Sequence, residues 1–285
     1  MKLARYWARG EGEAVDPKGN RVRYAARGWS DESVDAARDR AREIAQRVAA
    51  RIVADPTKRN QYEYGDRPLP EPVIQKIGDS IVTRNGYGAL VLNTDNLMFV
   101  DVDREEPAPL SAAGLESIIS SVFSLFSKPT PPVPKADPVM DSIGSVVERH
   151  SLSGRVYKTA GGYRVLITSK SFEAGTSDTE ALLQEFGADP LYMRLCRMQE
   201  SFRARLTPKP WRCDFRNPPG TFPFETPQAE AQFRAWEAEY KSKSAPYATC
   251  RFLSAAGSGR VAPEFESLIR YHDQETKATS GLPLA

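Results

Sequence analysis

The chain has 285 residues, of which 40% are hydrophobic, so it can form one large domain or two packed lobes with a proper core. It has no run of roughly 18 to 20 apolar residues and no apolar N-terminal stretch, so we expect neither a membrane span nor a signal peptide. The net charge of +2 excludes a general polycation, and the three cysteines form no Cys-x-x-Cys pair, which favours a reducing cytoplasm over a disulfide framework or a zinc site.

The first segment of the chain is predicted to form two strands and a long helix. Residues 3–9 and 21–27 have the composition of strands and flank a turn at residues 16–20. Ser30 is the expected N-cap of a helix that runs to about residue 54, because acidic residues follow it directly.

The next segment, residues 55–72, is rich in charged and turn residues and is predicted to be irregular. Residues 74–77 are assigned to a short helix, and residues 79–84 to a strand that ends at Asn-Gly. We therefore define residues 1–87 as an N-terminal α/β lobe.

Residues 88–103 are predicted to form a β-hairpin. An apolar run at residues 88–92 is followed by turn residues at 93–96 and by a second apolar run at 97–103. We therefore expect the two runs to pair with each other.

The second of these runs carries two carboxylates, Asp101 and Asp103. Because side chains alternate along a strand, both lie on one face while Val100 and Val102 lie on the other. Two like charges repel unless a cation lies between them, and Mg²⁺ or Mn²⁺ prefers oxygen ligands. The alternative interpretation is a strand that runs out into solvent.

The central part of the chain begins with an insertion at about residues 107–138, whose second half is too proline-rich for a helix or a central strand. A helix is predicted at residues 112–126, and another at 139–150. Residues 155–158 and 163–168 then flank Gly161-Gly162, which is typical of a hairpin with a glycine-rich turn.

The remaining segments are predicted to be mostly helical. Helices are expected at residues 177–186, 189–202 and 227–240, with a loose tail at residues 276–285. His150 and His272 are isolated in the sequence and are assigned structural roles.

From about residue 97 the predicted order is strand, helix, strand, strand, helix, strand, which is the ferredoxin-like β-α-β-β-α-β arrangement of an α+β protein. In that topology the first and third strands are central and adjacent, so the Asp101 strand should lie beside residues 163–168. We assign this core to residues 88–216, and a C-terminal helical extension with its tail to residues 217–285.

Two segments are locally basic. Residues 1–28 and 189–216 each contain seven lysines or arginines against three acidic residues, which favours a polyanionic partner; the alternative is a solvated charged face. In the second segment basic residues surround a tryptophan, as in contacts with a nucleic-acid strand, and the candidates are Arg203, Arg205, Lys209, Trp211 and Arg212. Trp211 could equally be a core or lid residue.

The second hairpin supplies candidate phosphate ligands. If its strand lies beside the Asp101 strand, Lys158 and Arg164 can approach the carboxylates, and the amides of Gly161 and Gly162 can approach an anion. A carboxylate-bound metal together with such cations would suit a nucleoside triphosphate. An ordinary tight turn is the alternative for the two glycines.

This pattern resembles the archaeo-eukaryotic primase superfamily, whose catalytic core is an RRM-like unit. Asp101-Val102-Asp103 matches its first motif, and residues 159–164 match its second, with Arg164 where a histidine is expected. Asp214 is the candidate for its third carboxylate. The resemblance covers residues 88–216.

The resemblance implies a primase-like nucleotidyltransferase or replication-associated protein. It would bind Mg²⁺ or Mn²⁺ through Asp101 and Asp103, together with a nucleoside triphosphate and single-stranded or primed nucleic acid. Two alternatives remain open, a non-catalytic nucleic-acid-binding module on the same fold and a metal-dependent nucleotide-sugar enzyme.

Overall fold

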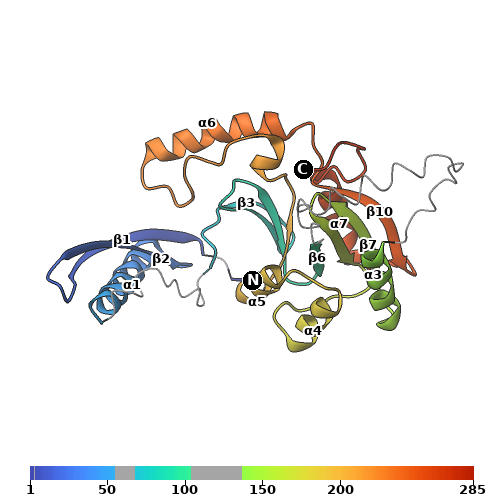
Figure 1. Cartoon of the computed structure of the whole chain (residues 1–285), viewed down its shortest axis with the longest axis horizontal. Helices are drawn as coiled ribbons and strands as arrows, with labels where there is room; N and C mark the ends of the chain where they lie inside the picture. The colour runs from blue at the N-terminus through green and yellow to red at the C-terminus, as the bar shows by residue number, and fades with distance from the viewer. Residues whose placement is uncertain (3, 55–67, 104–136) are drawn as a thin grey trace, which may run out of the picture.

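The structure is a computed structural model that describes residues 1–2, 4–54, 68–103 and 137–285. In these residues the protein is α+β, with one two-stranded and two four-stranded antiparallel sheets (Figure 1). The predicted helix at residues 112–126 and most of the proline-rich insertion lie outside the described residues.

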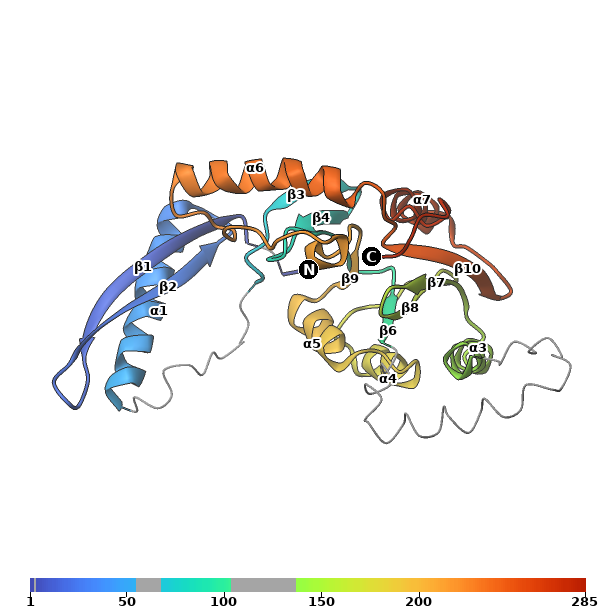
Figure 2. The same ribbon diagram turned by 45° about the horizontal axis from the view of Figure 1, so that its top comes forward.

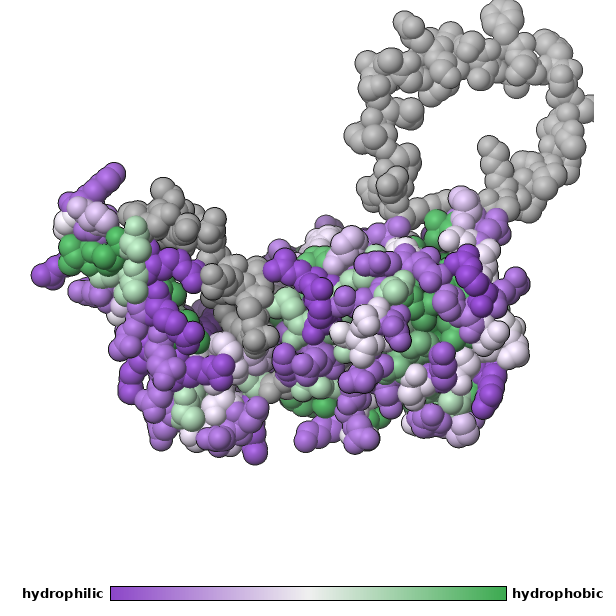
Figure 3. Space-filling view, turned by 90° about the horizontal axis from the view of Figure 1, so that it is seen from below, coloured by the Kyte–Doolittle hydropathy of each residue, from purple (hydrophilic) through white to green (hydrophobic). Residues whose placement is uncertain are grey.

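The N-terminal unit is a long hairpin packed on one helix, and it lies at one end of the molecule (Figure 1, Figure 2). Seen from below, its surface is mostly hydrophilic (Figure 3). Gly28 allows the hairpin to approach the helix closely, because a Cβ at this position would lie 2.2 Å from the backbone nitrogen of Ala41. Both strands are longer than predicted, and the helix is capped by Ser33 rather than Ser30. The elements are β1 (Tyr6–Val15), β2 (Arg21–Ser30) and α1 (Val34–Ala54).

The first four-stranded sheet has the order β3-β4-β5-β9. The predicted helix at residues 74–77 is wrong, because this segment pairs with β4 as a strand. The predicted hairpin of residues 88–92 with 97–103 is also wrong, because β5 pairs with β4 and β9. The strands are β3 (Val73–Ile77), β4 (Ser80–Arg84), β5 (Leu90–Thr94) and β9 (Phe202–Arg205).

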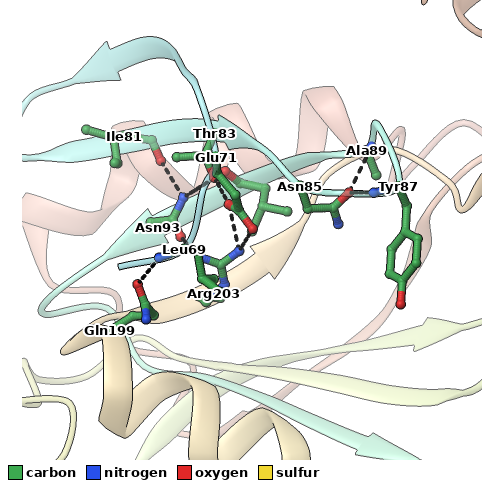
Figure 4. A network of polar contacts seen from close by, with 11 residues as sticks. Leu69, Glu71, Ile81, Thr83, Asn85, Tyr87, Ala89, Asn93, Gln199 and Arg203 are labelled. Carbon is green, nitrogen blue, oxygen red and sulfur yellow. Dashed lines mark hydrogen bonds and ion pairs between the residues drawn. The ribbon is translucent and has the colours of Figure 1, made fainter. Parts of the chain in front are cut away.

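A buried polar network explains why β9 joins this sheet (Figure 4). Arg203 of β9 donates to both carboxylate oxygens of Glu71, at 2.8 and 2.9 Å, and to Oδ1 of Asn93 at 2.7 Å. Thr83 donates to the same carboxylate, and Asn93 donates to Thr83. The ion pair is 10% exposed at Arg203 and 7% at Glu71, so it links β9 to the sheet away from solvent.

The second four-stranded sheet has the order β10-β7-β8-β6. The predicted adjacency of the Asp101 strand and the 163–168 strand is confirmed, with Asp101 opposite Arg164 and Asp103 opposite Gly162. The Asp101 strand ends the sheet rather than lying at its centre, because β9, the next strand along the chain after the second hairpin, belongs to the other sheet. The strands are β6 (Phe99–Asp103), β7 (Ser153–Thr159), β8 (Gly162–Ile167) and β10 (Cys250–Gly257).

Helices cover this sheet and the first one. Ile143, Val146 and Val147 of α3 enter the main hydrophobic core. The helix α6 crosses above the first sheet (Figure 2), where Phe233, Trp236 and Tyr240 form a second cluster. None of the helices in the described ranges is long and apolar enough to cross a membrane. The helices are α3 (Pro138–Arg149), α4 (Ser177–Glu185), α5 (Pro190–Gln199), α6 (Pro227–Ser244) and α7 (Glu266–Glu275).

The C-terminal residues are part of the core. Ala248 donates its N–H to the carbonyl of Pro283, and Ala285 donates back to the carbonyl of Ala248. Ala278 and Ala285 are buried, so the loose tail predicted for residues 276–285 is wrong. The strand β10 was not predicted, and it brings residues beyond 216 into the same sheet as β6.

His272 of α7 is fully buried against the second sheet. Its ring lies 5.7 Å from that of Phe99 and 5.0 Å from that of Tyr157, while Nδ1 is 3.1 Å from Oδ1 of Asp273. Burial lowers the pKa of His272, and the nearby Arg164 acts in the same direction, although Asp273 opposes both. The imidazole is therefore neutral in the folded protein at neutral pH.

We predict that His272 makes the free energy of unfolding fall as the pH is lowered from about 7 towards about 5. The unfolded chain takes up a proton near the ordinary pKa of 6.5, whereas the folded chain does not, so acid favours unfolding by up to about 1.4 kcal/mol per pH unit. Urea unfolding of the wild type and of His272→Gln measures the difference in slope. Asp273, whose pKa is lowered from 3.8, titrates below this range. Equal slopes would contradict a buried neutral His272.

Candidate functional site

The candidate site lies where β6 and β8 of the second sheet meet the end of β9. Arg164 and Asp101 stand opposite each other on paired strands, and Nε and Nη2 of Arg164 donate to the two Asp101 oxygens at 2.8 and 3.2 Å. The Arg164 side chain is 1% exposed and that of Asp101 is 32% exposed. Burial opposes the charge of Arg164, but the charge and hydrogen bonds of Asp101 outweigh it and raise the pKa of Arg164.

The third nitrogen of Arg164 connects the two sheets. Nη1 donates to the backbone oxygen of Arg205 at 2.8 Å and lies 3.5 Å from Nε2 of His272. All three nitrogens therefore have partners inside the protein. Arg164 holds Asp101 in place, and its geometry differs from that of the phosphate contact predicted for this position.

Arg205 differs from Arg164 in its hydrogen bonding. Its Nε and Nη1 atoms are buried and have no hydrogen-bond partner within the described residues. Burial and repulsion by Arg164 and Arg212 lower the pKa of Arg205 to about 10, while Asp101 acts against this shift. A guanidinium with buried donors and no acceptors is costly, and the oxygens of an anionic ligand would satisfy it.

Two further cations extend the charge from Arg205 towards the surface, and we call Arg205, Lys209 and Arg212 the cation cluster. Burial and repulsion by the other two members lower the pKa of Lys209, whereas Asp103 and Asp101 raise it. A Cβ on Gly161 would lie 3.3 Å from Nη2 of Arg212 and 3.7 Å from Oδ1 of Asp103. The tip of the β7–β8 hairpin therefore lies against Arg212 and Asp103.

The cation cluster faces a group of carboxylates. Burial and repulsion by Asp189 and Asp101 raise the pKa of Asp103, while Lys209 and Arg212 oppose the shift. Asp189 accepts from the N–H of Tyr192 at 2.6 Å as the N-cap of α5, and its own N–H donates to the carbonyl of Asp101 at 3.0 Å. Sequence reasoning identified Asp189 only as a helix start, because nothing local indicates that α5 begins beside β6.

Three of the predicted site residues do not contact the carboxylates or the cation cluster in the way that was predicted. Lys158 contacts the Tyr163 ring, with Nζ 4.0 Å from its centroid, and strand alternation puts it on the face opposite Arg164. Asp214 is exposed and ends a 3₁₀ helix, η4 (Pro210–Cys213), with a φ of 51°. Arg203 is engaged in the buried ion pair with Glu71, which leaves its guanidinium no access to a nucleic-acid strand.

The remaining predicted residues lie at the edge of the cation cluster. Trp211 is 47% exposed, and Nζ of Lys209 lies 5.3 Å from its ring centroid. The amide of Gly161 donates to Oγ1 of Thr159 at 3.3 Å, so it is engaged in the turn. Gly162 begins β8 opposite Asp103.

The carboxylates of the site provide only some of the ligands that a metal ion needs. Among the described residues no group of three or more histidine, cysteine or acidic side chains is arranged to bind an ion. Mg²⁺ commonly binds one or two carboxylates and takes its other ligands from water and substrate phosphates. Asp101 and Asp103 lie two residues apart on β6 and therefore on one face of the strand, so they offer the one or two carboxylates of this smaller requirement.

No family model, curated protein or solved structure matches this chain. The geometry of the site is thus the basis for a functional assignment. That geometry consists of an arginine with two buried nitrogens that no described residue pairs, two flanking cations, and three carboxylates at the junction of two sheets.

We predict opposite effects on stability for two arginines of β9. Arg203→Met leaves Glu71 buried without its cation and lowers the free energy of unfolding by roughly 3 kcal/mol or more. Arg205→Met removes two buried donors that find no acceptor among the described residues and raises the free energy of unfolding by about 1 kcal/mol. Urea unfolding followed by circular dichroism measures both. An equal loss of stability in the two variants would show that Arg205 is paired in the folded protein.

Proposed function

We propose that the protein is a primase-like nucleotidyltransferase that binds a nucleoside triphosphate and single-stranded or primed nucleic acid in a replication-associated role. The observation that carries the proposal is the Arg205 guanidinium beside Lys209 and Arg212, because two of its buried nitrogens have no hydrogen-bond partner in the described part of the chain. Phosphate groups supply the oxygens that such a cluster lacks.

The order of elements supports the same proposal. From β6 the described chain continues with α3, β7, β8, the helix pair α4 and α5, and β9, with β6 and β8 adjacent. As far as β8 this succession has the element order of an RRM-like core that carries its carboxylates on the first strand, although β9 pairs in the other sheet and β10 pairs with β7. The three cysteines are buried free thiols, which agrees with the proposed cytoplasmic location.

Asp103 and Asp101 are the proposed ligands of Mg²⁺ or Mn²⁺. When bound, such an ion neutralises charge on phosphate oxygens and lowers the pKa of an attacking hydroxyl. In this proposal Arg205, Lys209 and Arg212 bind and orient the phosphates. Arg164 keeps the Asp101 carboxylate in its orientation through two hydrogen bonds.

One observation favours a second candidate, a nucleic-acid-binding module without catalysis. Both oxygens of Asp101 already accept from Arg164, which reduces their capacity to bind a metal. The two candidates share the cation cluster and differ in whether the carboxylates are needed.

Primer synthesis and extension by the full chain with Mg²⁺ or Mn²⁺ separate the candidates. We predict that Asp103→Asn abolishes product formation, because it removes a proposed metal ligand. Asp95→Asn, which changes an exposed carboxylate in the turn before β6, should have no effect.

Arg212→Gln should weaken nucleoside triphosphate binding roughly tenfold. Arg216→Gln, which removes an exposed arginine paired with Glu239, should not.

Normal synthesis by Asp103→Asn would contradict the catalytic proposal. Absence of synthesis, together with salt-sensitive binding of single strands that survives Asp103→Asn, would identify the binding module instead. Unchanged affinity in Arg212→Gln would contradict the phosphate role of the cation cluster in both candidates.

A further inference from the structure

We propose that Tyr87 and Trp211 form a stacking site for the bases of single-stranded nucleic acid at the edge of the cation cluster. The inference rests on the proposed function, because it assigns the position of the strand relative to the phosphate-binding cations. Tyr87, which no sequence motif indicated, is part of this site, and the ligands of Trp211 are bases.

The two rings are exposed and touch each other. Tyr87 is 51% exposed and Trp211 is 47% exposed, and their ring centroids lie 5.1 Å apart in an edge-to-face arrangement with an interplanar angle of 88°. Among the large hydrophobic side chains exposed in the described part of the chain, these two are the aromatic ones. Exposed aromatic faces are the surfaces on which unpaired bases stack.

The turn that carries Tyr87 is held rigidly. Oδ1 of Asn85 accepts from the N–H groups of Tyr87 and Ala89, at 3.0 and 3.1 Å. Gly88 has a φ of 81° and lies against Trp236, so that a Cβ there would be 2.3 Å from the indole ring. Figure 4 shows the Tyr87 ring projecting away from this turn. A turn whose backbone is already ordered presents the ring with little backbone entropy left to lose when a base binds.

Trp211 is positioned by the 3₁₀ helix η4. It lies in η4 between two buried residues, Pro210 and Cys213. Lys209 and Arg212 flank it in sequence, and Nζ of Lys209 is 5.3 Å from its ring centroid. Phosphates therefore meet cations next to the point at which bases meet rings, which is the alternation that a single strand presents.

The cations and the small apolar area of the site favour a nucleic-acid strand over a protein partner. Two half-exposed rings provide little apolar area for a protein partner, whose interfaces need larger buried surfaces. Lys209, which lies beside the Trp211 ring, attracts the phosphates of a strand. An open pair of rings accepts bases of any identity, so we expect little sequence preference.

Fluorescence anisotropy with two single-stranded oligonucleotides of equal length tests the inference. One carries thymine bases and the other is abasic, so that they share phosphate charge and differ only in bases. We expect the wild type to bind the thymine strand roughly tenfold more tightly, and Tyr87→Ala and Trp211→Ala to reduce that preference. Trp211→Phe should retain most of it. Leu253→Ala, which removes an exposed apolar side chain on β10, is the control and should change nothing.

The outcomes separate the stacking site from the proposed function. Equal binding of both strands by the wild type, or a preference unchanged in Tyr87→Ala and Trp211→Ala, would overturn the stacking site and leave the phosphate-binding proposal intact. Binding of neither strand would overturn both. A loss of affinity for the abasic strand in Trp211→Ala would mean that the substitution disturbs the cations, and this too would contradict a stacking role.

Discussion

The ion pair between Arg164 and Asp101 joins the parts of the protein on which the candidate site depends. A guanidinium that is 1% exposed needs acceptors for all its nitrogens, and Arg164 finds them on β6, through Asp101, and on β9, through the carbonyl of Arg205. Since β9 belongs to the other four-stranded sheet, these bonds fix the two sheets against each other. They also place the Arg205 side chain beside the carboxylates.

Arg203 and Arg205 show two uses of the same residue type on one strand. They lie two residues apart and therefore on one face of β9, yet Arg203 is paired with Glu71 while two buried nitrogens of Arg205 have no acceptor within the ranges that the structure describes. The first pairing supports the sheet. The arrangement of Arg205 lowers the stability of the fold, and no contact within the described residues compensates for it. We interpret Arg205 as a binding residue for a phosphate ligand.

The sequence predicted local structure better than pairing between distant segments. The β7–β8 hairpin, α1 and α3 follow from apolar runs, caps and glycines near them in sequence, whereas the pairing of the Asp101 strand with the Arg164 strand was predicted from the order of the elements. The assignment of β9 to the first sheet depends on Arg203 meeting Glu71 across 132 residues, which no local pattern indicates. For the same reason the proximity of Asp189 and of Tyr87 to the site could not be predicted, and Lys158, on the opposite face from Arg164, was expected at the carboxylates.

The central claim is that the unpartnered nitrogens of Arg205 bind phosphate oxygens. The arginine Nε–Hε NMR signals of the full chain, titrated with inorganic triphosphate, test this most directly, with the Arg205 signal assigned from Arg205→Lys. We predict that the Arg205 signal shifts and becomes protected from exchange with water, while the signal of Arg203, already paired with Glu71, stays in place. An Arg205 signal that does not respond to saturating triphosphate would contradict the account.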